Sequence, residues 1–306
     1  MQQIAVFGKV NLDTILYVDK LKIGENHICL QTLVDVGGKG ANTAIALAKL
    51  GVKVVLAACL GNDNLSQSIT KRLEKYGVDV SMLKYTNNQT GKTFIVVDSQ
   101  GINTMFHILG ANADFNPEYI DWTFLETVSA VFVQMGLPQD TVREVITMSK
   151  RNGKYVFVDP AGFPSDGSLE LISYADTVAP NEVELLKLTK ETQVEKAAKK
   201  LISLGVEEVL VKRGEKGATL FTQKASYHQD AYQVPVVDTT GAGDALNAAY
   251  IMAKFKKLDP RQALKIAVAA SAITVTRQGT SSASPTKGEL VEFLKSVQED
   301  EIAKLL

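Results

Sequence analysis

Short apolar runs alternate along this sequence with amphipathic stretches, and this alternation limits the possible folds more than any other feature. The apolar runs are typical of strands that are buried on both faces of a parallel sheet. The expected strands are Ile4–Gly8, Val54–Cys59, Ala130–Gln134, Tyr155–Asp159, Thr177–Ala179 and Glu208–Lys212. The expected helices between them are Ala41–Leu50, Leu65–Tyr76, Thr141–Arg151 and Val194–Leu204. The pattern predicts an α/β fold with a doubly wound, mostly parallel sheet.

Residues at the ends of these stretches support the same division. Asn64 and Asp140 are expected to cap the starts of two helices, because short polar side chains accept hydrogen bonds from the first free N–H groups. Glycines stand where four helices should stop, where a left-handed backbone conformation is common. These glycines are Gly51, Gly77, Gly153 and Gly205.

Two segments, Lys20–Val36 and Thr90–Leu109, alternate apolar and polar residues and contain turn signals. Such alternation predicts antiparallel hairpins that stand apart from the main sheet. A small sheet built from two separate segments suggests a lid or an oligomer contact. A surface excursion without a function is the alternative.

The overall composition excludes several classes of protein. A formal net charge of -1 over 306 residues argues against nucleic acid or an anionic membrane as the main partner. The two cysteines, Cys29 and Cys59, are expected to be buried and reduced inside strands. The three histidines are scattered and form no metal-ligand or triad pattern. The first residues lack the features of a signal peptide, so a cytoplasmic protein is expected.

The string "DTTGAGD", residues 238–244, is the most specific motif. It follows a strand-like stretch, Val234–Val237, and precedes a helix-like one, Ala245–Ala253. Small residues at a helix N-terminus leave backbone N–H groups open, and the helix dipole favours an anion there. Asp244 would repel a phosphate unless it had another role. Accepting the proton of an attacking hydroxyl fits, which indicates phosphoryl transfer.

Three further motifs contain polar residues near expected strand or helix ends. The glycine-rich "GGKGAN", residues 37–42, would let a ligand approach the backbone. Asn11 and Asp13 share one side of an extended segment and could grip sugar hydroxyls, or they could form an Asx turn. Asn181 and Glu184 could hold Mg²⁺ through waters, although a capping box is the better local interpretation.

Taken together, these motifs resemble the ribokinase family of sugar kinases, and the resemblance runs nearly from end to end. It extends through "GKVNLD", "VGGKGAN", "TGKTFIVVDSQGINTM", "GANAD", "PNEVE", "VLVKRGEKG", "VVDTTGAGDALNAAY" and "AITVTRQGTSSASP". The resemblance implies a single α/β domain over residues 1–306 with a β-sheet lid, residues 14–36 and 90–109. It also implies a lid that serves as a homodimer contact.

The resemblance also implies roles for individual residues and implies ATP, Mg²⁺ and K⁺ as ligands. Asp244 would be the base. The anion hole would be formed by the N–H groups of Gly241, Ala242 and Gly243. The acceptor sugar would be held by Asn11, Asp13, Gly38, Lys39 and Asn42. The nucleotide side would comprise Asn181, Glu184, Lys212, Gly214 and Gly217, with Mg²⁺ at Glu184 through water. K⁺ would bind at Asp238 and Thr240, and Arg277 and Gly279 would lie near the adenine.

One position departs from the family pattern. Ribokinases usually carry an acid after the strand that matches Ala130–Gln134, and this chain has Gly136 there. The missing carboxylate puts D-ribose in doubt as the acceptor. A small free sugar, a pentose or hexose, is the expected acceptor. The alternatives are a phosphosugar, for which Lys9, Lys39 and Lys92 are the nearby cations, a nucleoside, and a non-catalytic sugar sensor.

Overall fold

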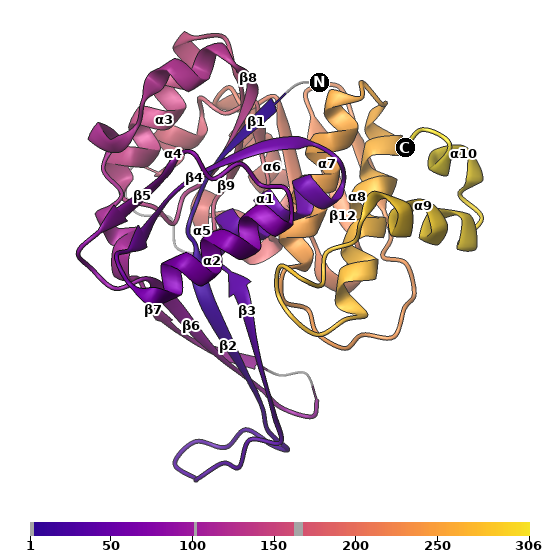
Figure 1. Cartoon of the computed structure of the whole chain (residues 1–306). Helices are drawn as coiled ribbons and strands as arrows, with labels where there is room; N and C mark the ends of the chain where they lie inside the picture. Colours follow the sequence, from indigo (N-terminus) through magenta and orange to yellow (C-terminus); the bar gives the residue numbers. More distant parts are fainter. Residues whose placement is uncertain (1–2, 101–102, 162–167) are drawn as a thin grey trace.

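The computed structural model describes residues 3–100, 103–161 and 168–306, and Figure 1 shows the body of the molecule with a slender projection below it. The described residues form a nine-stranded sheet in the order β13-β12-β11-β10-β9-β8-β1-β4-β5. Its strands are β1 (Gln3–Phe7), β4 (Lys53–Gly61), β5 (Leu83–Thr86), β8 (Val128–Gln134), β9 (Tyr155–Asp159), β10 (Thr177–Val178), β11 (Glu208–Lys212), β12 (Ala218–Thr222) and β13 (Ser226–Gln229). All neighbouring pairs are parallel from β5 to β11, and β12 and β13 are antiparallel additions at one edge.

Helices cover both faces of this sheet, as expected for a doubly wound fold. Successive residues of β1 point to opposite faces, so Ile4 and Val6 join one core and Ala5 and Phe7 join the other. The first core packs against α1 (Lys39–Lys49), α2 (Asn64–Lys75), α7 (Ala242–Phe255), α8 (Pro260–Val275), α9 (Lys287–Ser296) and α10 (Asp300–Ala303). The second packs against α3 (Gln139–Arg151), α4 (Ser168–Ile172), α5 (Glu182–Thr189) and α6 (Val194–Ser203). The 3₁₀ turns are η1 (Gly110–Asp114), η2 (Pro117–Tyr119), η3 (Trp122–Glu126) and η4 (Gly214–Lys216).

The projection in Figure 1 is a second, four-stranded sheet in the order β3-β2-β6-β7, called the lid here. Its strands are β2 (Asn11–Tyr17), β3 (Gln31–Gly37), β6 (Gly91–Val97) and β7 (Asn103–Ile108). Strand β2 follows β1 almost directly, so the lid grows out of the main sheet at the end where β1 finishes. This continuity places residues 11–13 at the junction of lid and body.

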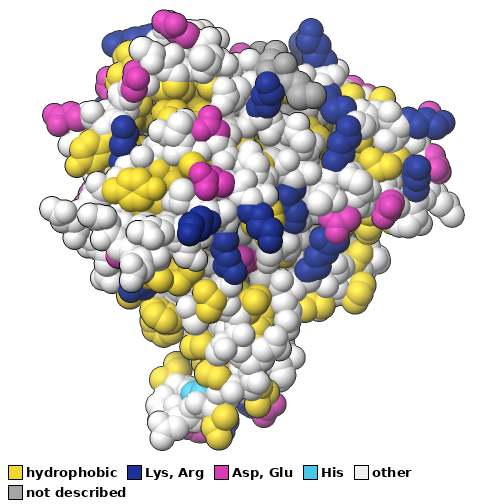
Figure 2. Space-filling model, viewed as in Figure 1, with side chains coloured by type: hydrophobic (Ala, Val, Ile, Leu, Met, Phe, Trp, Pro, Cys, Tyr) yellow, Lys and Arg dark blue, Asp and Glu magenta, His cyan; other side chains and the backbone are white. Residues whose placement is uncertain are grey.

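The two faces of the lid differ in burial. Asn11, Asp13 and Ile15 alternate along β2 and are buried on the face that meets the body. On the opposite face, Phe94 and Phe106 are cross-strand neighbours and are 38% and 60% exposed. Both side chains therefore lie outside the buried core of the lid, which is formed by Ile15, Ile95 and Val97. Hydrophobic side chains are visible on the projecting lid in Figure 2.

Several local expectations were wrong. The helix caps are Asp63 and Pro138, each one or two residues before the expected Asn64 and Asp140. The stretch Val234–Val237 is an irregular segment in which two valines are exposed, because it pairs with no strand. Cys29 lies exposed in the loop at the tip of the lid, whereas Cys59 is buried in β4 as expected.

The expected helix ends were confirmed at all four glycines, which have positive φ angles between 65° and 117°. A left-handed residue at these positions lets the chain leave the helix without steric strain. Among the helices of the described residues, none combines the length and apolar character that crossing a bilayer requires.

Candidate active site

The two glycine-rich motifs meet where α1 and α7 begin. Asn42, in the first turn of α1, donates a hydrogen bond from Nδ2 to Oδ2 of Asp244, at 2.8 Å. Lys39 Nζ lies 3.7 Å from the other carboxylate oxygen, Oδ1. Residues about 200 positions apart therefore converge on one carboxylate, since α1 and α7 pack together on the same face of the sheet.

The environment of Asp244 changes its acidity. The residue is only 4% exposed, and burial raises the pKa of its carboxyl because a charged group loses solvation. The nearby Asp159 charge also raises this pKa, while Lys39 and the Asn42 hydrogen bond oppose the increase. A carboxylate with a raised pKa is a stronger base than one on the surface, and Asp244 Oδ1 has no hydrogen-bond partner among the described residues.

The backbone before Asp244 forms an open helix N-terminus. Gly241 caps α7 with φ at 77°, a conformation that glycine adopts without strain. A bond of 3.4 Å from Ala242 N to Thr239 O closes the turn, and no backbone acceptor within the described ranges is found for the N–H groups of Gly241 and Gly243. The free amides of Gly241 and Gly243 and the positive end of the helix dipole thus lie beside Asp244, an arrangement that suits an anion.

A second buried charge cluster supports this end of the site, and sequence reasoning missed most of it. Lys212 Nζ contacts Asp159 Oδ2 at 2.8 Å, and Asn247 Nδ2 donates to the same oxygen at 2.6 Å. Burial alone would raise the pKa of Asp159, but Lys212 and Lys39 lower it to about 2. The Asp159 charge in turn raises the pKa of Lys39 despite its partial burial. The position of Asp159 at the carboxyl end of a parallel strand was a signal that could have been used.

Lys212 also lies next to the helix N-terminus. A Cβ on Gly243 would stand 3.5 Å from Cδ and 3.8 Å from Nζ of Lys212. The expected nucleotide-side lysine and the expected anion hole are therefore neighbours. N–H donors of an ammonium and of a helix N-terminus at one place suit a phosphate.

The expected acceptor residues lie at the base of the lid. Asn11 donates to Thr93 Oγ1 at 3.0 Å and accepts from Asn112 Nδ2 at 2.9 Å. Asp13 is buried beside Gly37, where a Cβ would stand 1.8 Å from Oδ2 of Asp13. Burial and the charges of two nearby aspartates, Asp35 and Asp244, raise the pKa of Asp13 to about 7, against the Thr93 hydrogen bond. Thr93 and Asn112 were missed by sequence reasoning, since their role depends on contacts across the lid.

The buried side chains of this site present several acceptor atoms that lack partners. Four such oxygens, each without a hydrogen bond within the described part of the chain, are Asp13 Oδ1, Asn42 Oδ1, Asp244 Oδ1 and Asn247 Oδ1. Buried polar atoms are nearly always satisfied in proteins, so unpaired acceptors in one region indicate a ligand rich in donors. Hydroxyl groups of a sugar have this property.

Other expected site residues have evident structural roles. Asn181 and Glu184 form a capping box at the start of α5, with bonds of 2.7 Å and 2.8 Å. Gly214 and Gly217 shape the turn from β11 to β12, with φ angles of 57° and 78°. The capping interpretation of Asn181 and Glu184 is therefore confirmed. A capping box does not prevent the same residues from also facing a nucleotide. Gly38 caps α1 with φ at 84°.

The expected cation site lies where the loop before α7 meets the lid. Asp238 is 4% exposed; its Oδ1 accepts from Thr240 N at 2.9 Å, while Asp238 Oδ2 and Thr240 Oγ1 have no partner among the described residues. Burial and the Asp238 charge raise the pKa of Tyr17, on β2, to about 12. Arg277 forms an ion pair with Glu289 at 2.7 Å, so its guanidinium has a structural partner.

One buried carboxylate links the lid to the segment after α8. Asp35, on β3, accepts hydrogen bonds from the backbone N–H groups of Thr280 and Ser282, both at 3.1 Å. The Ser282 hydroxyl adds a bond of 2.6 Å. Gly279, with φ at 110°, gives this segment its shape. No sequence motif had indicated Asp35.

Comparison with known proteins identifies the class. Residues 1–287 match the model of the pfkB family of carbohydrate kinases. The deoxyribokinase of Salmonella typhi is 32% identical over 300 residues, covering 95% of this chain and 98% of that protein. The solved ribokinase of Thermotoga maritima superposes with a TM-score of 0.87 at 37% identity, covering 96% of this chain and 100% of that one.

A ribokinase of Arabidopsis thaliana, solved with ribose and ATP, has a TM-score of 0.85 at 30% identity and covers 96% of this chain and 98% of its own. The fold and the site therefore define a carbohydrate kinase with a ribokinase-like fold. The chain belongs to the pfkB family of carbohydrate kinases, as the resemblance of its motifs had indicated.

Proposed function

We propose that the protein transfers the γ-phosphoryl group of ATP to a hydroxymethyl group of a small free sugar, D-ribose or a related pentose or hexose. The observation that carries this proposal is the set of unpaired, buried oxygens around Asp244 and Asp13. A polyhydroxylated acceptor would satisfy them. The similar deoxyribokinase and ribokinases support an acceptor of this size.

In the proposed mechanism Asp244 is the base. Its carboxylate accepts the proton of the attacking hydroxyl while that oxygen forms the new bond to phosphorus and the bond to ADP breaks. The N–H groups of Gly241, Ala242 and Gly243 hold the negative charge that develops on the transferred group. Asn42 and Lys39 orient the carboxylate through the contacts described above. Asn11, Asp13 and Gly38 complete the sugar site.

The nucleotide side is proposed to comprise Asn181, Glu184, Lys212, Gly214 and Gly217. Lys212 supports this role most directly, because it lies beside Gly243. Among the described residues no cluster of three or more acidic, histidine or cysteine side chains could enclose a metal. Mg²⁺ would therefore be held near Glu184 through waters, where it would neutralise charge on the phosphates.

K⁺ is proposed to bind at Asp238 and Thr240. The unpaired Oδ2 of Asp238 and Oγ1 of Thr240 are both buried, and oxygen atoms of this kind suit an alkali cation. These residues lie one to four positions before Gly241 and Ala242. Their proposed role is to fix the loop that supports the anion hole.

We further propose that residues 1–306 act as one cytoplasmic catalytic domain, with residues 14–36 and 90–109 as the lid. The lid would also join two copies into a homodimer. Its outward face supports this, because Val34, Phe94, Phe106 and Ile108 are 37–60% exposed. A second copy of the same apolar face could cover them through a two-fold contact.

The test is acceptor-dependent ADP release with Mg²⁺, with and without K⁺. The panel comprises D-ribose, 2-deoxyribose, fructose, fructose 6-phosphate, tagatose 6-phosphate and adenosine. Efficient turnover of a free sugar is expected. Preference for a phosphosugar or for adenosine would favour the corresponding kinase, and sugar binding without any ADP release would favour a sensor.

A further inference from the structure

The backbone of Lys9 is hydrogen-bonded through both its N–H and its carbonyl at the junction between body and lid. Its backbone N–H donates to Gln134 Oε1 at 2.7 Å, and its carbonyl accepts from Gly40 N at 3.1 Å. A Cβ built on Gly136 would stand 2.9 Å from both Cε and Nζ of Lys9. The ammonium therefore occupies the space beside Gly136 that a longer residue at this position would enter.

Lys9 differs from the other lysines of the site in whether its charge has an acidic partner. Lys39 and Lys212 each contact a buried aspartate, whereas Lys9 forms no ion pair with any acid in the described ranges. Burial and the neighbouring Lys39 charge lower the pKa of Lys9. A cation that is partly removed from water without a counter-ion is costly, so an anionic ligand would stabilise it.

Gln134 supplies a second donor at the same place. Its Oε1 already accepts from Lys9 N, which fixes the orientation of the amide. Its Nε2 lies 2.9 Å from the Cβ position at Gly136, as Lys9 Nζ does, and Gln134 is only 1% exposed. An ammonium and an amide N–H group therefore converge on the side of Gly136 where other residues carry a side chain. Two donors of this kind match the two oxygens of a carboxylate.

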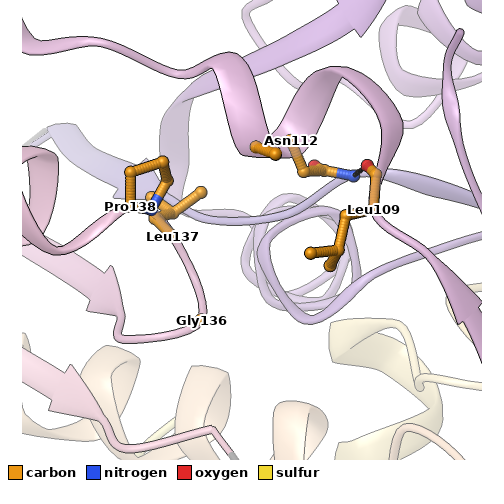
Figure 3. A pocket seen from close by; sticks show the side chains of 6 residues that line it. Leu109, Asn112, Gly136, Leu137 and Pro138 are labelled. Carbon is orange, nitrogen blue, oxygen red and sulfur yellow. Dashed lines mark hydrogen bonds between the residues drawn. The ribbon is translucent and has the colours of Figure 1, made fainter. Parts of the chain in front are cut away.

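This donor pair adjoins a pocket and the expected sugar residues. Gly136 lines a pocket of about 300 Å³ together with Leu109, Asn112, Ala113, Leu137 and Pro138, shown in Figure 3. Asn112 also accepts from Val10 N at 2.9 Å and donates to Asn11. The pocket is therefore a neighbour of the acceptor site and offers few polar groups of its own. A phosphate, which usually needs more donors than two, fits this place less well than a carboxylate.

We propose that Lys9 determines acceptor specificity and that the favoured acceptor is an acidic sugar, whose carboxylate is bound by Lys9 and Gln134 at Gly136. This inference rests on the proposed function and narrows it. The hydroxymethyl end of the acceptor faces Asp244, and the carboxylate lies at the opposite end. A neutral sugar leaves the Lys9 charge unpaired. The preference for the acidic sugar therefore comes from the ion pair that only its carboxylate forms with Lys9.

The test compares kcat/KM for matched neutral and acidic sugars, D-ribose with D-ribonate and D-glucose with D-gluconate. The acidic member of a pair is expected to be better by about tenfold or more. Lys9→Ser is expected to lower kcat/KM for that acid by about 10- to 100-fold and to leave the neutral sugar within a few-fold. Lys53→Ser, which removes an exposed charge at the start of β4, is the matched control and should change neither.

Gly136→Glu is an independent test of the proposal, because the new carboxylate would pair with Lys9 inside the protein. It should suppress the acidic sugar and spare the neutral one. Better turnover of the neutral member of both pairs, or an equal loss of both acceptors in Lys9→Ser, would overturn the proposal. A phosphosugar that outperforms the acids in a Lys9-dependent way would overturn the choice of carboxylate.

Binding separates this inference from the proposed function. Thermal unfolding of the wild type with D-ribonate or D-gluconate should show a stabilisation that Lys9→Ser lacks. If this binding occurs without ADP release from any sugar, the kinase proposal fails and the Lys9 site stands. If ADP release occurs with neutral sugars only and neither acid stabilises the wild type, the Lys9 site fails and the kinase stands.

Discussion

The proposed phosphoryl-transfer end of this site and its proposed acceptor end differ in how their charges are paired. At the first end, Lys212 and Asn247 both contact Asp159 Oδ2, and Asn42 and Lys39 hold Asp244. At the second end, Lys9 stands beside Gly136 without an acidic partner in the described ranges. Both ends are partly buried, so solvent alone does not explain the difference.

This difference separates the side chains that the protein itself holds in place from those that gain a partner only when a ligand binds. A paired cluster holds its geometry before any substrate binds, which suits a transition state that is the same for every sugar. An unpaired group obtains its partner from the acceptor and therefore discriminates between acceptors.

The largest effect is expected from Asp244→Asn, which removes the proposed base and keeps the size of the side chain. Turnover should fall by about a hundredfold or more, since general-base catalysis contributes at least that much. ATP binding, measured by titration calorimetry, should be largely kept. Asp140→Asn, at an exposed position in the first turn of α3, is the control. A mutant at position 244 that retains most of the wild-type rate would show that Asp244 is not the base.

The next effect concerns stability. Asp159→Asn leaves the buried Lys212 ammonium without a carboxylate, so the free energy of unfolding should drop by about 3 kcal/mol or more. Chemical denaturation at pH 7 measures it. The exposed Asp230→Asn should cost far less, because its ion pair with His228 is open to solvent. An equal loss in both variants would contradict the importance of the buried pair.

The pH dependence of this effect has a definite sign. The folded-state pKa of Asp159, about 2, lies below the unfolded value of about 4, so the unfolded state binds the proton first. The stability from its charge is complete above pH 4 to 5 and is lost as the pH falls toward 2. The difference between wild type and Asp159→Asn should therefore shrink over this interval.

The pH at which kcat/KM falls on the acidic side of its profile, the acidic limb, is a finer test of the surroundings of Asp244. Asp244 must be ionised to accept a proton, and its pKa is raised, so kcat/KM should fall at a higher pH than for an ordinary aspartate. Lys39→Met removes a charge that lowers this pKa and should move the limb to still higher pH. Lys92→Met should leave it in place. A limb that stays fixed in Lys39→Met would mean that another group controls it.

Much of the fold could be predicted from local pattern, for identifiable reasons. Strands β9 and β11 were predicted with their observed bounds, since apolar runs buried on both faces are unambiguous in a parallel sheet. The helix-ending glycines were also correct, because their backbone conformation excludes most other residues. Val234–Val237 has the composition of a strand and lacks a neighbouring strand, so local pattern failed there.

The site was predictable only where a motif is continuous in sequence. Asp244 and Asn42 belong to such motifs, and the structure brings them together. Asp159 and Asp35 do not: each acts through partners far along the chain, Lys212 at 53 positions and Thr280 at 245. Such contacts arise from the packing of whole elements, so the sequence indicates at most that Asp159 ends a parallel strand and does not indicate its partners. Lys9 was noted as a cation, but its position beside Gly136 required the fold.

The smallest effect is expected at the lid, away from both ends of the site. Phe106 is 60% exposed and faces outward beside Phe94, so Phe106→Ser should weaken the proposed homodimer by about tenfold in Kd and change monomer stability little. Sedimentation equilibrium measures the association. Tyr174→Ser, at a body position that is 52% exposed, is the matched control. If the wild type is monomeric at all concentrations, the apolar face has no second copy as its partner. If Phe106→Ser dissociates the dimer and kcat/KM for the acceptor falls with it, association helps to order the strands that hold Asn11 and Asp13.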